Sequence, residues 1–166
     1  GGTGSQTHLS AELFKSMAGV NIVRVSYKGN APALTDVLSG QLQLMFITTG
    51  TVAPHRKSGR LRALAVTSAQ PSALAPDLPT MAASGVRGYE AISVYGMFAP
   101  SRTSEAIINR LNQEIVRVLN GAEVKEKFLN AGVEVVASSP GEFAAAIKAD
   151  MARMGKVIKD AGIREE

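Results

Sequence analysis

Cysteine and tryptophan are absent from this sequence of 166 residues, and histidine occurs only twice, as His8 and His55. Without cysteine, the sequence holds no disulfide, no thiolate metal ligand and no cysteine nucleophile. Neither histidine stands in a metal-binding pattern, so we expect no metal ion and no cofactor. Several common kinds of catalytic centre are therefore excluded.

Long apolar runs are also absent, and none is long enough to cross a bilayer. The sequence begins at Gly1 rather than at a methionine and shows no basic-then-apolar leader, so we expect a processed or truncated piece. Apolar residues make up 45% of the chain and charged residues 19%, which is ordinary for a globular protein with a core.

Aromatic residues are few, at 5%, although the formal net charge is +4. The basic residues are scattered along the chain, and no nucleic-acid-binding motif is present. Stacking on bases needs aromatic side chains in the same place as the positive charge. We therefore expect no nucleic-acid partner and interpret the charge as a solvated surface.

A glycine-rich opening at residues 1–8 is the feature around which the sequence is organised, and apolar residues at helical spacing follow it. Glycine permits a tight turn, while Ser5 and Thr7 are good N-cap residues for a helix. The first N–H groups of a helix have no partner inside it, and the helix dipole makes this end positive. The pattern predicts a carboxylate site, with an ordinary connection as the alternative.

Three short apolar segments, at 22–25, 42–47 and 61–66, are predicted to be strands separated by short helices. This alternation is typical of an α/β fold with a mostly parallel sheet flanked by helices. Ligands bind beyond the carboxyl ends of such strands. The turns at 27–30 and 47–51 are therefore added to the candidate site.

The second half of the chain is predicted to be mostly helical. A proline-containing connection at 70–88 leads to a strand at 89–100, and a further short strand is expected at 133–136. Apolar stripes predict helices that face a core, the first of them after Thr103. The last helix begins at a capping box, Ser-Pro-Gly-Glu at 139–142.

Ser5 and His8 lie one helical turn apart, which raises the alternative of a Ser/His hydrolase. Ser5 does not stand in a G-x-S-x-G pattern, and no third group near it would orient the imidazole. We assign no catalytic residue. His8 is better interpreted as a neutral hydrogen-bond donor to a bound oxyanion, or as a partner of its own helix.

Several motifs form an ordered set that runs through essentially the whole chain. They include Gly2-Thr3-Gly4-Ser5-x-x-His8-Leu9, Tyr27-Lys28-Gly29-x-x-Pro32-Ala33, Pro54-His55-x-x-Ser58-Gly59, Leu61-Arg62-Ala63-Leu64-Ala65-Val66-Thr67, Gly88-Tyr89-Glu90 and Lys159-Asp160-Ala161-Gly162. Together they resemble the Bug (TctC-type) periplasmic solute-binding receptors of tripartite tricarboxylate transporters.

The resemblance implies a fold of the periplasmic-binding-protein type II kind, with two α/β lobes hinged about a cleft and no enzymatic activity. Residues 1–90 would be the ligand-binding second lobe, and residues 91–166 the return crossover strand and the helices that complete the first lobe. The implied ligand is a small organic carboxylate, and the implied partners are membrane transporter subunits reached from the periplasm. The implied ligand-binding residues are Gly4, Ser5, Thr7, His8, Gly29, Thr48 and Ser93.

Three departures from the family pattern modify these expectations. The family's N-terminal lobe, with its own carboxylate-holding loop, would precede Gly1. Ile47-Thr48 stand where the family has an aspartate after Phe46, which disfavours an amino-bearing ligand. Ser93-Val94-Tyr95-Gly96 replaces Ser-Trp-Phe-Gly and changes a wall of the cleft. Without the first lobe, helices of 91–166 would expose apolar stripes, which predicts a homodimer; a folded remnant that binds nothing is the alternative.

Overall fold

The computed structural model describes residues 2–164, so Gly1, where the predicted glycine-rich turn begins, lies outside the described part. The chain divides into two compact units. Unit 1 combines Gly1–Ser93 with Arg153–Glu166, and unit 2 is Val94–Ala152. The assignment of residues 1–90 and 91–166 to two lobes stays a prediction. Among the described residues, no helix is both long and apolar enough to cross a membrane.

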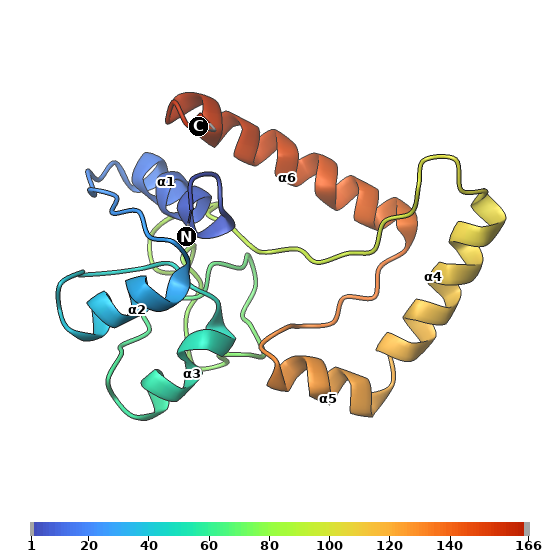
Figure 1. Cartoon of the computed structure of the whole chain (residues 1–166), viewed down its shortest axis with the longest axis horizontal. Helices are drawn as coiled ribbons and strands as arrows, with labels where there is room; N and C mark the ends of the chain where they lie inside the picture. The colour runs from blue at the N-terminus through green and yellow to red at the C-terminus, as the bar shows by residue number, and fades with distance from the viewer. Residues whose placement is uncertain (1, 165–166) are drawn as a thin grey trace. The chain divides into compact units, whose positions relative to one another are not determined.

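The first helix of unit 1, α1 (Gln6–Ala18), begins and ends where the sequence predicts (Figure 1). Ser5 is its N-cap, and the Ser5 side chain accepts a hydrogen bond from the backbone of the first turn. Gly19 follows the last turn with a left-handed φ of 64°, and its N–H donates to the carbonyl of Lys15. Local sequence alone is enough to fix both ends.

Two shorter helices follow α1 in unit 1. α2 (Asn30–Leu38) begins after the N-cap Gly29, and Pro32 lies in its first turn as predicted. α3 (Thr49–Lys57) begins earlier than expected: residues 48–51, predicted to be a turn, form its N-cap and first turn. The four residues carry hydroxyls and a glycine that suit a turn and a helix start equally, which explains the error.

The core of unit 1 packs α1 against residues from much later in the chain. Its buried residues are Leu9, Leu13, Tyr89, Ala91, Met154 and Val157. Tyr89 is only 1% exposed, and its hydroxyl donates to the carbonyl of Ser10 at 2.9 Å. Burial raises the pKa of Tyr89 to about 12, which keeps this donor protonated. An ion pair between Arg153 and Glu90 joins the stretch around Tyr89 to the residues near Met154 and Val157.

Unit 2 contains α4 (Glu105–Leu119), α5 (Ala122–Asn130) and the first part of α6 (Pro140–Asp160), which continues into unit 1. The capping box of α6 is confirmed. Glu142 accepts from the N–H of Ser139 at 2.8 Å, and Ser139 Oγ accepts from the N–H of Glu142 at 3.2 Å. The hydrogen bonds that the Glu142 carboxylate accepts from the N–H and the hydroxyl of Ser139 hold the pKa of Glu142 below its usual value. α4 begins at the N-cap Ser104 rather than Thr103.

The apolar stripe of α4 does not face a core, contrary to the sequence-based expectation. Ile107 is 54% exposed, Leu111 is 46% exposed, and no residue of α4 is buried among those the structure describes. Helical periodicity identifies the apolar side of a helix but carries no information about what covers that side. The prediction of the helix was correct and that of its burial in a core was wrong. The exposed stripe instead matches the second expectation, that helices of 91–166 expose apolar side chains without the first lobe.

The predicted parallel sheet is not confirmed. In the described residues there is one isolated parallel bridge, between Val66 and Thr80, and the segments expected to be strands are otherwise extended without a ladder. Their apolar side chains are exposed, with Val23 at 82% and Leu64 at 67%. A strand exists only with a neighbour in register, and alternating apolar residues predict a pleated surface without supplying that neighbour. Of the predicted α/β architecture, the helices are therefore confirmed and the parallel sheet is not.

Truncation of Leu13 tests the position of the core. We expect Leu13→Ala to lower the free energy of unfolding by about 2–5 kcal/mol, because it leaves a cavity among buried side chains. The matched change Leu111→Ala, on the exposed side of α4, is expected to cost less than about 1 kcal/mol. Urea denaturation followed by circular dichroism measures both, and equal losses would contradict this account of the core.

Candidate functional site

The candidate site is the turn that leads into α1. Gly4 has a φ of 74°, in the left-handed region that favours glycine, and this turns the backbone so that Ser5 can cap the helix. The N–H of Ser5 donates to the carbonyl of Gly2 at 3.2 Å, which closes the turn. The glycine at position 4 is therefore a structural requirement of the helix start.

Two backbone amides at the start of α1 have no partner among the residues that the structure describes. The N–H of His8 donates to Ser5 Oγ at 3.4 Å, and the N–H of Leu9 donates to the carbonyl of Ser5 at 2.9 Å. The N–H groups of Gln6 and Thr7 donate to no group in the described part of the chain. They lie at the positive end of the helix dipole, where an anion is favoured.

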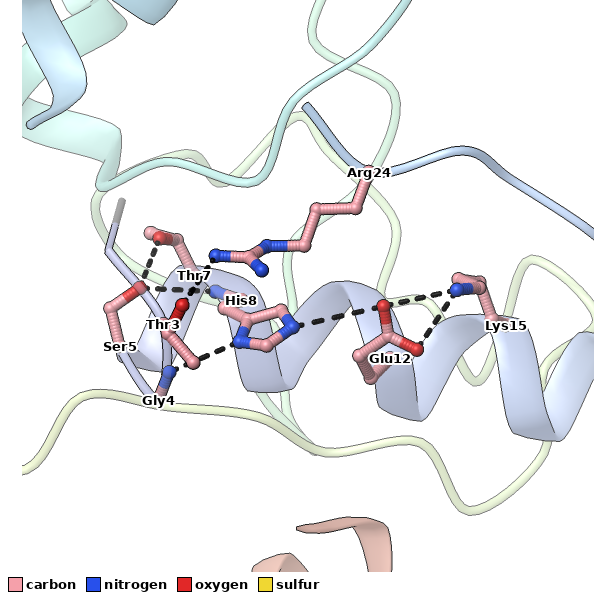
Figure 2. A network of polar contacts seen from close by, with 8 residues as sticks. All are labelled: Thr3, Gly4, Ser5, Thr7, His8, Glu12, Lys15 and Arg24. Carbon is pink, nitrogen blue, oxygen red and sulfur yellow. Dashed lines mark hydrogen bonds and ion pairs between the residues drawn. The ribbon is translucent and has the colours of Figure 1, made fainter. Parts of the chain in front are cut away.

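Hydroxyl groups border these two amides. Ser5 Oγ and Thr7 Oγ1 are 3.2 Å apart and share a hydrogen bond. Both side chains are partly exposed, so either hydroxyl can rotate to donate to a ligand. Four of the predicted ligand-binding residues, Gly4, Ser5, Thr7 and His8, are thus brought together in one turn (Figure 2).

His8 is buried, with 7% of its surface exposed, and both ring nitrogens face protein groups. Its Nδ1 accepts a hydrogen bond from the N–H of Gly4 at 3.1 Å, and its Nε2 lies 3.8 Å from Glu12 Oε1 (Figure 2). Because Nδ1 acts as an acceptor, the proton of the neutral ring is assigned to Nε2. The geometry matches the interpretation of His8 as a partner of its own helix.

The charges around His8 favour its neutral form. Burial lowers the pKa of His8 from 6.5, and the positive charges of Arg24 and Lys15 lower it further, while Glu12 acts in the opposite direction. Glu12 is itself held by Lys15, whose Nζ lies 2.9 Å from its carboxylate. The sequence analysis missed Glu12, although its spacing of four residues from His8 is a recognisable helical pair.

Arg24 is a second residue that the sequence analysis missed. Its Nη2 donates to Thr3 Oγ1 at 3.3 Å, which places a guanidinium beside the turn (Figure 2). Arg24 is exposed and forms no ion pair within the described residues. The sequence did offer a signal for this residue, because Arg24 is the one charged residue in the otherwise apolar segment 22–25.

The other predicted ligand-binding residues are not joined to this turn by any hydrogen bond or ion pair of the described residues. Gly29 is the N-cap of α2, with a φ of 106°, and its N–H donates to the carbonyl of Tyr27 at 2.9 Å. Thr48 is the N-cap of α3, and its hydroxyl lies 2.8 Å from Thr51 Oγ1. Ser93 is exposed near the end of the first part of unit 1. Their ligand-binding roles stay predictions.

Ser5 and His8 do not form the pair that a Ser/His hydrolase needs. Ser5 Oγ accepts from the backbone N–H of His8, while the ring nitrogens of His8 face Gly4 and Glu12. A general base must reach the hydroxyl proton of the nucleophile. No group of three or more metal-ligating side chains occurs in the described part of the chain.

The solved structures similar to this chain define its class as that of periplasmic binding proteins. One is a protein of R. palustris in a structure with adipate, 39% identical, with a TM-score of 0.80 over 96% of this chain and 54% of that one. Another is the periplasmic binding protein BugD, 31% identical, with a TM-score of 0.74 over 96% of this chain and 54% of that one. The chain therefore spans about half the length of these proteins.

The sequence comparisons narrow the class to one family. Residues 1–163 match the tripartite tricarboxylate transporter family receptor, TctC, and the chain belongs to this family. A protein from the clcB-clcD intergenic region of Pseudomonas knackmussii is 38% identical over 79% of this chain and 78% of its own length. The resemblance inferred from the sequence motifs is confirmed.

Lowering the pH tests the burial of His8. Because the pKa of His8 is lowered in the folded state, the unfolded chain binds more protons below about pH 6.5. The free energy of unfolding should therefore fall as the pH is lowered from about 7.5 to about 5. His8→Asn should make this fall shallower, because asparagine keeps an acceptor near the position of Nδ1 and does not titrate. His55→Asn, at the second histidine, should retain the full slope; equal slopes in all three proteins would refute the assignment.

Proposed function

We propose that this chain is the carboxylate-binding part of a solute receptor that captures a small organic carboxylate in the periplasm and delivers it to membrane transporter subunits. Membership of the TctC family supports the receptor class. The observation that carries the proposal is the pair of unpartnered amides, of Gln6 and Thr7, at the start of α1. The receptor performs no chemistry on its ligand in this proposal.

The two amides match the chemistry of a carboxylate. They belong to consecutive residues at the positive end of a helix, so one carboxylate can accept from both. Each hydrogen bond to a charged group contributes about 1.5–3 kcal/mol. The Ser5 and Thr7 hydroxyls, 3.2 Å apart, offer further donors at the same place. The turn thus supplies several donors without a charged side chain in contact with the ligand.

Arg24 adds the positive charge that the turn itself lacks. It reaches Thr3 of the turn and has no carboxylate partner among the described residues, so its charge is available to attract an anion. The relative solved with adipate supports a ligand with two carboxylates. We assign the first carboxylate to the amides of α1 and the attraction of a dianion to Arg24.

Replacement of one amide tests the binding site directly. Gln6 is the first residue of α1, a position at which proline is accepted, and Ser5 before it has the extended backbone that proline requires. Gln6→Pro therefore deletes one N–H and keeps the helix. We expect the dissociation constant for adipate, measured by isothermal titration calorimetry, to rise about ten- to a hundredfold.

Two control variants separate this effect from others. Gln6→Ala removes the same side chain but retains the amide, so it should bind adipate like the unchanged chain. Glu105→Pro makes the equivalent change at the first residue of α4, after an N-cap of similar backbone conformation, and should also leave binding unchanged. If a panel of small carboxylates, adipate included, produces neither heat nor a rise in melting temperature, the proposed function is wrong.

The charge of Arg24 is tested by its neutral counterpart. Arg24→Gln should weaken adipate binding about two- to fivefold, because the guanidinium lies beside the turn in an exposed position. The effect should shrink as salt is added, since exposed charges are screened. Arg62→Gln removes an equal charge from another exposed position of unit 1 and serves as control. An equal loss in both variants would contradict a local role for Arg24.

The homodimer predicted from the sequence stays a prediction. The exposed apolar residues of unit 2, among them Leu111 of α4 and Phe98, are what such contact would cover. Light scattering at high concentration measures the mass of the chain in solution, and a monomer under these conditions would contradict the dimer.

A further inference from the structure

The hydrogen bond between Gly4 and His8 connects a titratable ring to the backbone of the candidate site. The N–H of Gly4 donates to Nδ1 of His8 at 3.1 Å, across the turn that precedes α1. Gly4 has no other hydrogen bond among the described residues, and its φ of 74° is the unusual backbone angle on which the turn depends. The imidazole is therefore the group that holds this glycine in place.

This hydrogen bond exists only when the His8 ring is neutral. Protonation places a hydrogen on Nδ1, so two donors then face each other and the Gly4 amide loses its acceptor. The ring is buried, with 7% of its surface exposed, whereas Gly4 is exposed, so the freed N–H can turn only to mobile water instead of a ring nitrogen fixed by the core. The charge state of one ring thus decides whether the turn is fixed.

We propose that His8 is a positioning residue that keeps the Gly4 turn in its ligand-binding form while its ring is neutral, so that acidification loosens the turn and weakens carboxylate binding. The proposal rests on the function proposed above and adds a regulation of the same site. His8 acts through Gly4 and does not contact the ligand in this account.

A competing effect of protonation would strengthen carboxylate binding instead of weakening it. An imidazolium near the start of α1 would attract an anion and strengthen binding at low pH. Glu12 Oε1, 3.8 Å from Nε2, is placed to balance the new positive charge, whereas the Gly4 N–H has no second protein acceptor among the described residues. Arg24 and Lys15, the other charged side chains that act on this ring among the described residues, oppose its protonation. The loss of the hydrogen bond should therefore outweigh the added charge, so that carboxylate binding weakens as the pH falls.

Nuclear magnetic resonance of the unliganded, ¹⁵N-labelled chain tests the hydrogen bond itself. Long-range ¹H–¹⁵N spectra should show neutral His8 with its proton on Nε2 and a bare Nδ1. As the pH falls, the Gly4 amide signal should move with the same midpoint as the His8 ring. His8→Asn retains an acceptor and should abolish this movement, while His55→Asn should preserve it. A neutral ring protonated on Nδ1, or a Gly4 signal that ignores the titration of His8, would overturn the proposal.

Adipate titrations by calorimetry then test the consequence for binding. The affinity of the unchanged chain should fall at least about tenfold between about pH 7.5 and about pH 5, while that of His8→Asn should change much less. The protonation of adipate itself is common to both proteins and cancels in the comparison. A rise in affinity at low pH, or equal pH profiles in both, would overturn the proposal. If adipate fails to bind at any pH, the proposed function fails, and the Gly4 signal still decides whether the His8 contact exists.

Discussion

The first turn of an α-helix always presents N–H groups that the helix cannot satisfy, and α1 leaves two of them, from Gln6 and Thr7, without a partner among residues 2–164. Every other part of the candidate site serves this constraint. Gly4, with a φ of 74°, forms the turn before the helix, which the N–H of Ser5 closes by donating to the carbonyl of Gly2. The Ser5 side chain satisfies the N–H of His8 instead. The result is a small set of fixed donors, arranged before any ligand arrives.

Fixed donors are useful only if the helix that carries them is itself fixed. α1 buries Leu9 and Leu13 against Tyr89 and against Met154 of the last helix. Residues from both chain segments of unit 1 therefore hold this helix in place. The Tyr89 hydroxyl reaches the carbonyl of Ser10, one turn beyond the site. Long-range packing therefore determines the position of a site whose chemistry is local.

The sequence predicted a structural feature correctly wherever residues close in the chain determine that feature. Ser5, Gly19 and the Ser139–Glu142 box each act within a few residues, and all three helix ends are where the sequence placed them. The strands could not be predicted with the same success, because a ladder depends on distant backbone and only the Val66–Thr80 bridge forms in the described residues. The direction of the His8 ring was equally hidden, since it depends on the positive φ of Gly4. Arg24 was missed because its contact with Thr3 spans 21 residues.

The rule that ligands bind beyond the carboxyl ends of strands selected the turns at 27–30 and 47–51, which contain Gly29 and Thr48, although the segments before them form no ladder in the described residues. The rule retains value because the loop after a predicted strand is also the loop before the next helix. Gly29 and Thr48 are the N-caps of α2 and α3, as Ser5 is of α1. Of these three N-caps, Ser5 is the one whose side chain bonds to its own helix backbone. That bond holds the hydroxyl next to the amides of Gln6 and Thr7, which have no partner in the described part of the chain, so a single turn gathers the donors of the proposed carboxylate site.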